Sequence, residues 1–157
     1  MANQIAQYRN ITLTQGGADA FVQAIEYTNI DPSIGNCWLI RRVEMSFNLT
    51  CLLENLSADA AIQWSLARES LTAVGGLDNA DVLHNNGFAI ALTTSGQPFI
   101  PKTFVWEPPS GLMVVTPALY AQLDSTATGL TLVASMRVYY ETIKLSELDI
   151  LRMLSQG

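Results

Sequence analysis

The single histidine of the chain, His84, limits the chemistry that this sequence can support. A metal centre built on facing strands needs several histidines together with carboxylates, and this chain cannot supply the histidines. His84 could act as a general base only with a carboxylate to orient it. Asp78 and Asp81 lie near it in the sequence, but acids in such loops are usually only solvated. We therefore expect neither a metal site nor a histidine base.

The sequence also lacks the residues and motifs that nucleophilic catalysis needs. Cys37 and Cys51 lie fourteen positions apart in strand-like sequence, which favours two buried free thiols over a disulfide. No second histidine is available as a base, no Gly-x-Ser-x-Gly elbow is present, and the two Gly-Gly pairs lack the lysine of a phosphate-binding loop. We therefore expect no enzymatic activity and no cofactor.

Glycoside hydrolysis needs a pair of carboxylates. Five glutamates are candidates for such a pair: Glu26, Glu44, Glu54, Glu107 and Glu141. Their spacing in the sequence does not single out any two of them.

An aromatic platform for carbohydrate is the remaining binding chemistry. Six aromatic residues occur in strand-like sequence: Trp38, Trp64, Trp106, Tyr120, Tyr139 and Tyr140. Aromatic residues in strands more often belong to the core or to cross-strand pairs. We expect Trp38 and Trp64 to be buried, whereas Tyr139, on the more polar face of the last strand, is the better candidate for an exposed contact.

Composition favours a protein whose surface is covered by partners. The chain has 157 residues, of which 49% are hydrophobic and only 14% charged, well below the usual quarter. The alternative is a domain with a neutral polar surface. Its 14 acidic against 8 basic residues give a net charge of −6, which disfavours nucleic-acid binding. The N-terminal sequence has neither a basic arm nor a signal-peptide core, and no run is long enough to span a membrane.

Strands with two unlike faces must position these side chains. In residues 131–145 the apolar face is Leu132, Ala134, Met136, Val138 and Tyr140, and the other face carries Val133, Ser135, Arg137, Tyr139 and Glu141. We expect this stretch to be a central strand, because it is long and both faces hold apolar residues. Further strands are expected at 4–13, 20–28, 37–50, 60–68, 88–93 and 102–106, with strand-like sequence also at 112–115 and 117–124. Residues 69–86 are expected to form a long loop with a short helix near 79–83.

A short helix is expected after the last strand. Ser146 is a suitable N-cap, and Leu148, Leu151 and Leu154 follow at helical spacing. The predicted helix, 146–155, is too short to be stable alone in water. We therefore expect it to pack on its own domain or against a neighbouring subunit.

The strand pattern predicts an all-β fold, an eight-stranded antiparallel β-sandwich with a short C-terminal helix. Eight strands over about 150 residues fit a jelly roll better than the seven strands and about 100 residues of an immunoglobulin sandwich. We expect one jelly-roll domain over residues 1–157, with 146–155 as its helical tail.

In this organisation the chain resembles the single-jelly-roll coat proteins of icosahedral viruses and tail-less phages. The final strand and tail, Ser-Met-Arg-Val-Tyr-Tyr-Glu-Thr-Ile-Lys-Leu-Ser-Glu-Leu, carry part of this resemblance. It implies a structural virion protein that self-assembles into a homo-oligomer of many copies in the host cytoplasm, with other capsid proteins as further candidate partners. Many such coats begin with a basic arm, whereas this chain begins Met-Ala-Asn-Gln-Ile. A membrane, a second protein or a preformed shell would then separate it from a genome.

The residues expected to contact neighbouring subunits lie on the last strand and in the tail. They are Arg137, Tyr139, Glu141, Leu148, Leu151 and Leu154. A carbohydrate-binding, lectin-like β-sandwich module is the alternative function. Exposed aromatic residues and loop acids would form its site.

Overall fold

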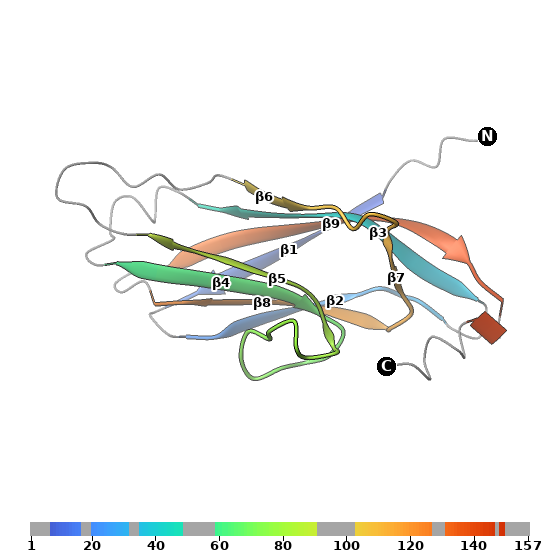
Figure 1. Ribbon diagram of the computed structural model, residues 1–157, viewed down its shortest axis with the longest axis horizontal. Helices are drawn as coiled ribbons and strands as arrows, with labels where there is room; N and C mark the ends of the chain where they lie inside the picture. The colour runs from blue at the N-terminus through green and yellow to red at the C-terminus, as the bar shows by residue number, and fades with distance from the viewer. Residues whose placement is uncertain are drawn as a thin grey trace.

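The computed structural model describes residues 7–16, 20–31, 35–48, 59–90, 103–126, 131–146 and 148–149. These residues form two antiparallel sheets packed face to face (Figure 1). The first sheet has the order β1-β9-β3-β6, with β7 also paired to β3, and the second has the order β2-β8-β4-β5. None of the described segments forms a helix with the length and hydrophobicity needed to cross a bilayer.

The first sheet contains β1 (Gln7–Gln15), β9 (Leu132–Lys144), β3 (Asn36–Phe47), β6 (Thr103–Trp106) and β7 (Leu112–Val114). The second sheet contains β2 (Val22–Tyr27), β8 (Ala118–Ser125), β4 (Ala60–Ala67) and β5 (Val82–Ile90). Most connections cross from one sheet to the other, so neighbours within a sheet are distant in sequence. This is the arrangement of a jelly roll.

The strand β9 is central, as predicted, because it pairs with β1 on one side and β3 on the other. Its predicted core face is confirmed, since all five side chains are buried. Tyr140 stacks on Trp38 with 3.6 Å between ring centroids. The predicted burial of Trp38 and Trp64 is also confirmed, and Trp64 packs among three phenylalanines from both sheets: Phe47, Phe88 and Phe104.

The predicted count of about eight strands is wrong, because the described residues form nine. Both β6 and β7 pair with the same edge of β3, with Trp106 opposite Val43 and Leu112 opposite Ile40. They lie end to end and together occupy one strand position. The interruption at 107–111 contains Pro108 and Pro109, which cannot donate to the ladder.

The structure does not support the predicted C-terminal helix over 146–155. Of this segment only Ser146, Leu148 and Asp149 are described, and the Oγ of Ser146 accepts a hydrogen bond from the backbone nitrogen of Asp149 at 3.2 Å, as an N-cap does. Leu148 is 58% exposed. A short helix needs apolar packing to be stable, and more than half of the surface of this leucine is exposed.

The connection between β4 and β5 was also predicted wrongly in part. The short helix expected near residues 79–83 is absent from this described segment, where turns lead directly into β5 at Val82. The sequence Asn85-Asn86-Gly87 looks like a turn, yet it pairs along β4. Cross-strand pairing therefore overrides the local preference of these residues.

Residues 68–81 cover part of the outer face of the second sheet and are held there by uncharged polar side chains. One comes from each strand, in register across the sheet: Gln23, Gln122, Ser65 and Asn85. Ser65 and Gln122 are fully buried. We call these four residues the polar row. Such buried groups are stable only when hydrogen-bonded.

The polar row bonds both to itself and to the connection above it. Gln122 accepts from Ser65 at 2.5 Å and donates to Gln23 at 3.1 Å. Gln23 in turn accepts from the backbone nitrogen of Leu71 at 3.0 Å, and Asn85 donates to the carbonyl of Gly75 at 2.5 Å. The connection is therefore fixed to the sheet.

Candidate contact surface on the outer face of the first sheet

Three of the residues expected to contact a neighbour lie on the outer face of the first sheet. Arg137, Tyr139 and Glu141 project there because the alternate side chains of β9 fill the core. Since β9 is flanked by β1 and β3, side chains from both neighbours reach these residues. The predicted site therefore lies on a packed, paired strand.

Arg137 and Tyr139 belong to a chain of hydrogen bonds across three strands. The Nε of Arg137 donates to Asn10 Oδ1 on β1 at 2.8 Å, and its Nη1 donates to the Tyr139 hydroxyl at 3.3 Å. That hydroxyl donates to Glu44 Oε2 on β3 at 3.1 Å. The hydrogen bond and the electrostatic interaction with Tyr139 raise the pKa of Arg137 above its ordinary value, so the residue stays cationic.

Arg42 extends the chain to the edge of the sheet. Its guanidinium bridges Glu44 at 2.5 Å and Glu107 at 3.3 Å, and it lies 5.8 Å from the centroid of the Tyr139 ring. On the other side, Tyr8 lies 5.9 Å from the Tyr139 ring, and the Arg137 guanidinium lies 5.1 Å from the Tyr8 ring. We call this group the outer-face network: Tyr8, Asn10, Arg42, Glu44, Glu107, Arg137 and Tyr139.

The outer-face network makes Tyr139 a poor carbohydrate platform. A sugar stacks on the open face of an aromatic ring, but Arg42 and Tyr8 already contact the Tyr139 ring. Trp106, another aromatic candidate, stacks on His84 with 4.5 Å between centroids. These contacts occupy part of the ring surface of Tyr139 and Trp106, two of the aromatic candidates for a lectin-like site.

Glu141 joins the same face through a separate pair, with Arg41 Nη2 at 3.1 Å from its Oε2. Leu148, the fourth expected contact residue, is exposed just beyond β9. Leu151 and Leu154 lie outside the described residues. The structure thus brings Arg137 and Tyr139 into one network and places Glu141 beside it.

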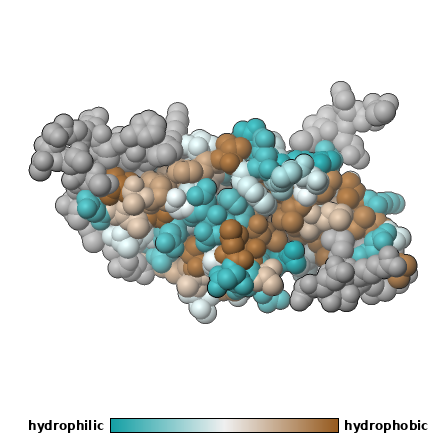
Figure 2. All heavy atoms as spheres, viewed as in Figure 1, coloured by the Kyte–Doolittle hydropathy of each residue, from teal (hydrophilic) through white to brown (hydrophobic). Residues whose placement is uncertain are grey.

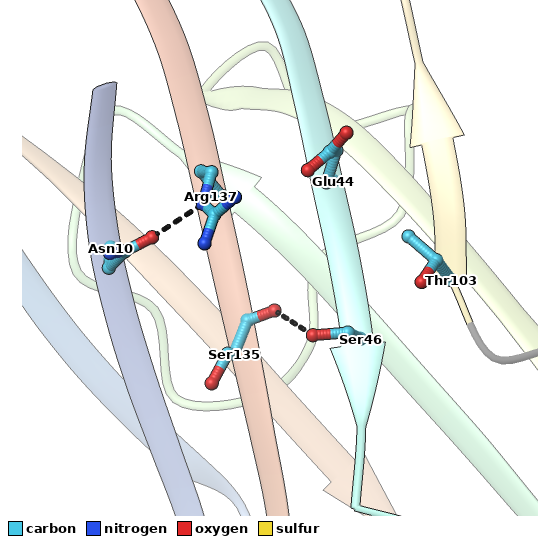
Figure 3. Close-up of a pocket in the computed structure, with 6 residues that line it drawn as sticks. All are labelled: Asn10, Glu44, Ser46, Thr103, Ser135 and Arg137. Atoms are coloured by element: carbon cyan, nitrogen blue, oxygen red, sulfur yellow. Dashed lines mark hydrogen bonds between the residues drawn. The ribbon is translucent and has the colours of Figure 1, made fainter. Parts of the chain in front are cut away.

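A shallow depression of about 200 Å³ lies within this surface (Figure 3). Its lining is polar and comes from β1, β9, β3 and β6: Asn10, Glu44, Ser46, Thr103, Ser135 and Arg137. Figure 3 shows Arg137 turned toward Asn10, with Glu44 facing it from the adjacent strand. Amide, hydroxyl, carboxylate and guanidinium groups together suit hydrogen bonding to another polar surface.

Of the residues considered for catalysis, Glu44 and Glu107 belong to the outer-face network, whereas His84 and Cys37 lie elsewhere. Burial lowers the pKa of His84 below its ordinary value, so the imidazole is neutral at pH 7. Cys37 is a free, buried thiol, and burial raises its pKa. Cys51 lies outside the described residues. Among the residues that the structure describes, no three metal-ligating side chains cluster.

Sequence reasoning missed most of the outer-face network. The one sequence feature that pointed to the network was the alternation in residues 37–50, which placed Arg42 and Glu44 on the more polar face of their strand. The pairing of β3 with β9, about a hundred residues later, has no local signal in the sequence. Tyr8 and Asn10 lay in a stretch without clear alternation.

No protein-family model and no curated protein matches this sequence. Solved structures do match. A chain of the unassembled KI polyomavirus VP1 pentamer superposes with a TM-score of 0.56 at 8% identity, covering 93% of this chain and 97% of that one. A chain from the crystal structure of tomato aspermy virus gives a TM-score of 0.50 at 12% identity, covering 90% of this chain and 80% of that one.

The likeness is one of fold. Both neighbours are viral capsid proteins with jelly-roll sandwiches. The chain described here shares that two-sheet jelly-roll fold over nearly its whole length. At such low identity the likeness carries no information about individual residues.

Proposed function

We propose that this protein is a capsid subunit, a structural protein that assembles in many copies into a viral shell. The observation that carries the proposal is the full-length likeness to a jelly-roll capsid protein, which covers 93% of this chain. Fold alone does not determine function. The proposal therefore also needs a surface suited to repeated contacts.

The outer-face network supplies such a surface. Tyrosine and arginine are enriched at the energetic centres of protein interfaces. Here their side chains are held by hydrogen bonds and ring contacts before any partner arrives, so little side-chain entropy remains to be lost on binding. In this role Arg137, Tyr139 and Glu141 contact a neighbouring subunit and catalyse no reaction.

The chemistry of the chain also fits a shell. Only 14% of its residues are charged, so large areas can be buried between copies at low desolvation cost. With 14 acids against 8 bases, bulk electrostatics disfavours direct contact with nucleic acid. We place the protein in the virion, in contact with other copies and with a second protein or a membrane between it and the genome.

Size-exclusion chromatography with light scattering tests this proposal. We expect the purified chain to form species of many times its 17.1 kDa mass, with the proportion rising with protein concentration. A chain that remains monomeric at millimolar concentration and binds immobilised glycans would contradict the proposal and favour the lectin-like module instead.

A further inference from the structure

The strand β5 contains a reactive dipeptide, Asn86-Gly87, which is the only Asn-Gly pair in the sequence. Both residues are exposed. Since β5 is the last strand of the second sheet, it pairs with β4 on one side only, and its other backbone edge has no neighbour among the described strands. Water therefore reaches the peptide bond between Asn86 and Gly87.

The side of the sandwich on which β5 lies is bridged by aromatic rings. There β5 faces β6 (Figure 1), and His84 stacks on Trp106 while Phe88 stacks on Phe104. Asn86 lies between His84 and Phe88 along the strand. Figure 2, in the view of Figure 1, shows hydrophilic side chains at the surface between hydrophobic ones in the region where β5 runs below β6. This margin is therefore in contact with solvent.

The Asn86 side chain lies against the next peptide nitrogen. The backbone N–H of Gly87 donates to Asn86 Oδ1 at 2.8 Å. A C=O bond is about 1.2 Å long, so the Cγ atom bonded to this oxygen lies within about 4 Å of the Gly87 nitrogen. Atoms in near-attack conformers are about 3 to 3.5 Å apart. A small rotation of the side chain therefore brings Cγ and the nitrogen to reacting distance.

The position on an edge strand also permits the backbone movement that the reaction needs. Ring closure between Asn86 and Gly87 requires the main chain to leave the extended conformation. Local opening of a strand that is paired on one side only breaks fewer hydrogen bonds than opening of a central strand. Gly87 has no Cβ to obstruct the attack and adopts other backbone conformations readily.

Two neighbouring asparagines lack these features. Asn85 donates from its side-chain nitrogen to the carbonyl of Gly75 at 2.5 Å. The Oδ1 of Asn79 accepts from the backbone nitrogen of Asp81 at 2.9 Å, two residues further along the chain. Neither is followed by glycine. Both side chains are therefore held by groups other than the following peptide nitrogen.

We propose that Asn86-Gly87 is a site of spontaneous deamidation in the folded protein, with water as the only co-reactant. This inference stands apart from the proposed function. The Gly87 nitrogen gives its proton to hydroxide and attacks Asn86 Cγ, so that a new C–N bond forms. The bond from Cγ to the side-chain nitrogen then breaks, and that nitrogen takes a proton from water and leaves as ammonia. The product is a five-membered succinimide.

Water opens the succinimide at either of its two carbonyl carbons. Breaking the new bond between Cγ and the Gly87 nitrogen gives aspartate at position 86. Breaking the original main-chain bond gives isoaspartate, in which the main chain runs through the side-chain carbon. Neither route oxidises or reduces any group. Because the ammonia is lost to solvent, the change runs in one direction and accumulates with the age of the protein.

Both products alter the β5 margin. A carboxylate replaces a neutral amide and adds one negative charge to a chain whose net charge is −6. Isoaspartate also lengthens the main chain by one carbon atom. Phe88 then loses its register with Ile62 on β4 and its stack on Phe104, whose ring centroid lies 5.1 Å away. We therefore expect the isoaspartate form to be less stable than the unmodified chain.

Peptide mapping by mass spectrometry tests the site on the full-length wild-type chain. The protein is incubated folded, at neutral and at mildly alkaline pH, and in parallel in concentrated urea. In the folded chain we expect Asn86 to be converted about tenfold faster than Asn79 and Asn85, with separate aspartate and isoaspartate peptides. The rate should rise with pH, because the attacking nitrogen has to lose its proton.

Three results would overturn the proposal. One is a folded chain in which Asn86 stays intact after the chain in urea is fully converted. Another is conversion of Asn86 no faster than that of Asn79 and Asn85 in the folded chain. The third is a rate that rises with low concentrations of urea in proportion to the unfolded fraction, because the reaction would then occur only in the unfolded chain.

Asn86→Gln is the matched control variant. It keeps the amide group, but its longer side chain would have to close a six-membered ring, so we expect position 86 to stay unmodified. After the same incubation the wild-type chain should unfold at lower urea concentration than before, whereas the urea midpoint of Asn86→Gln should not change. An equal loss in both proteins would contradict the expected effect of the modification on the β5 margin.

Discussion

At the scale of single residues, Tyr139 connects the two charged halves of the outer-face network. Its hydroxyl accepts from Arg137 at 3.3 Å and donates to Glu44 at 3.1 Å, and its ring lies between Tyr8 and Arg42. Exposed ion pairs alone contribute little to stability. A tyrosine that holds both charges in place is therefore the residue on which the order of this surface depends.

Replacing Tyr139 with phenylalanine removes the hydroxyl and keeps the ring. We expect the free energy of unfolding to fall by about 1 kcal/mol, since hydrogen bonds to charged groups are worth more than neutral ones but this surface is partly solvated. Urea unfolding measures the change. Tyr8→Phe is the control, because the contacts of Tyr8 are made by its ring. An equal fall in the free energy of unfolding in both variants would show that the Tyr139 hydroxyl has no special role.

His84 gives the fold a pH dependence. Burial lowers its pKa in the folded state below the unfolded value of 6.5, so the unfolded chain takes up the proton first as pH falls. The stability that the neutral imidazole contributes is therefore complete above pH 6.5 and is lost as pH falls toward the folded pKa. His84→Phe keeps a ring against Trp106 without the titration.

We expect the wild-type chain to lose stability relative to His84→Phe between pH 7 and pH 5, as measured by urea midpoints at several pH values. Parallel curves for the two proteins over this interval would show that His84 is not desolvated in the folded state.

At the scale of elements, the connection between β4 and β5 depends on the close approach of Gly75 to the sheet. A Cβ at this position would contact Val82 and would lie 2.7 Å from Leu71 Cδ1. The polar row beneath it is uncharged and hydrogen-bonded, so it fixes the connection without a pH-dependent group. An added methyl group must displace the connection or strain its contacts.

Gly75→Ala should therefore lower the free energy of unfolding by about 1 to 3 kcal/mol, in the range of overpacked cores. It should also speed limited proteolysis within residues 68–81. Gly16→Ala is the control, because a Cβ there meets no atom within 4 Å. Equal proteolysis of both variants and the wild-type chain would show that the connection tolerates the methyl group.

Particular residues also show how far the elements could be predicted. The alternation in residues 131–145 identified the core face of β9. A strand with one buried face alternates apolar and polar residues, so this property can be predicted from neighbouring residues alone. The polar start of β5 was read as a loop because its strand character comes from pairing with β4. Arg42 and Tyr139 meet because β3 pairs with β9, and strand order has no local signature.

At the scale of the whole molecule, the two sheets divide the surface into parts with different chemistry. The outer face of the first sheet carries the outer-face network, and the outer face of the second is partly covered by residues 68–81. In the proposed function, the jelly roll is the repeated unit and the outer-face network contacts a neighbouring copy.

Electron microscopy of the purified wild-type chain is the most direct test of the capsid-subunit proposal. Negative staining at concentrations where light scattering detects large species should show closed particles of uniform diameter, or rings of a fixed number of copies. Fields of dispersed monomers at every concentration, with circular dichroism showing folded β-sheet, would contradict the proposal.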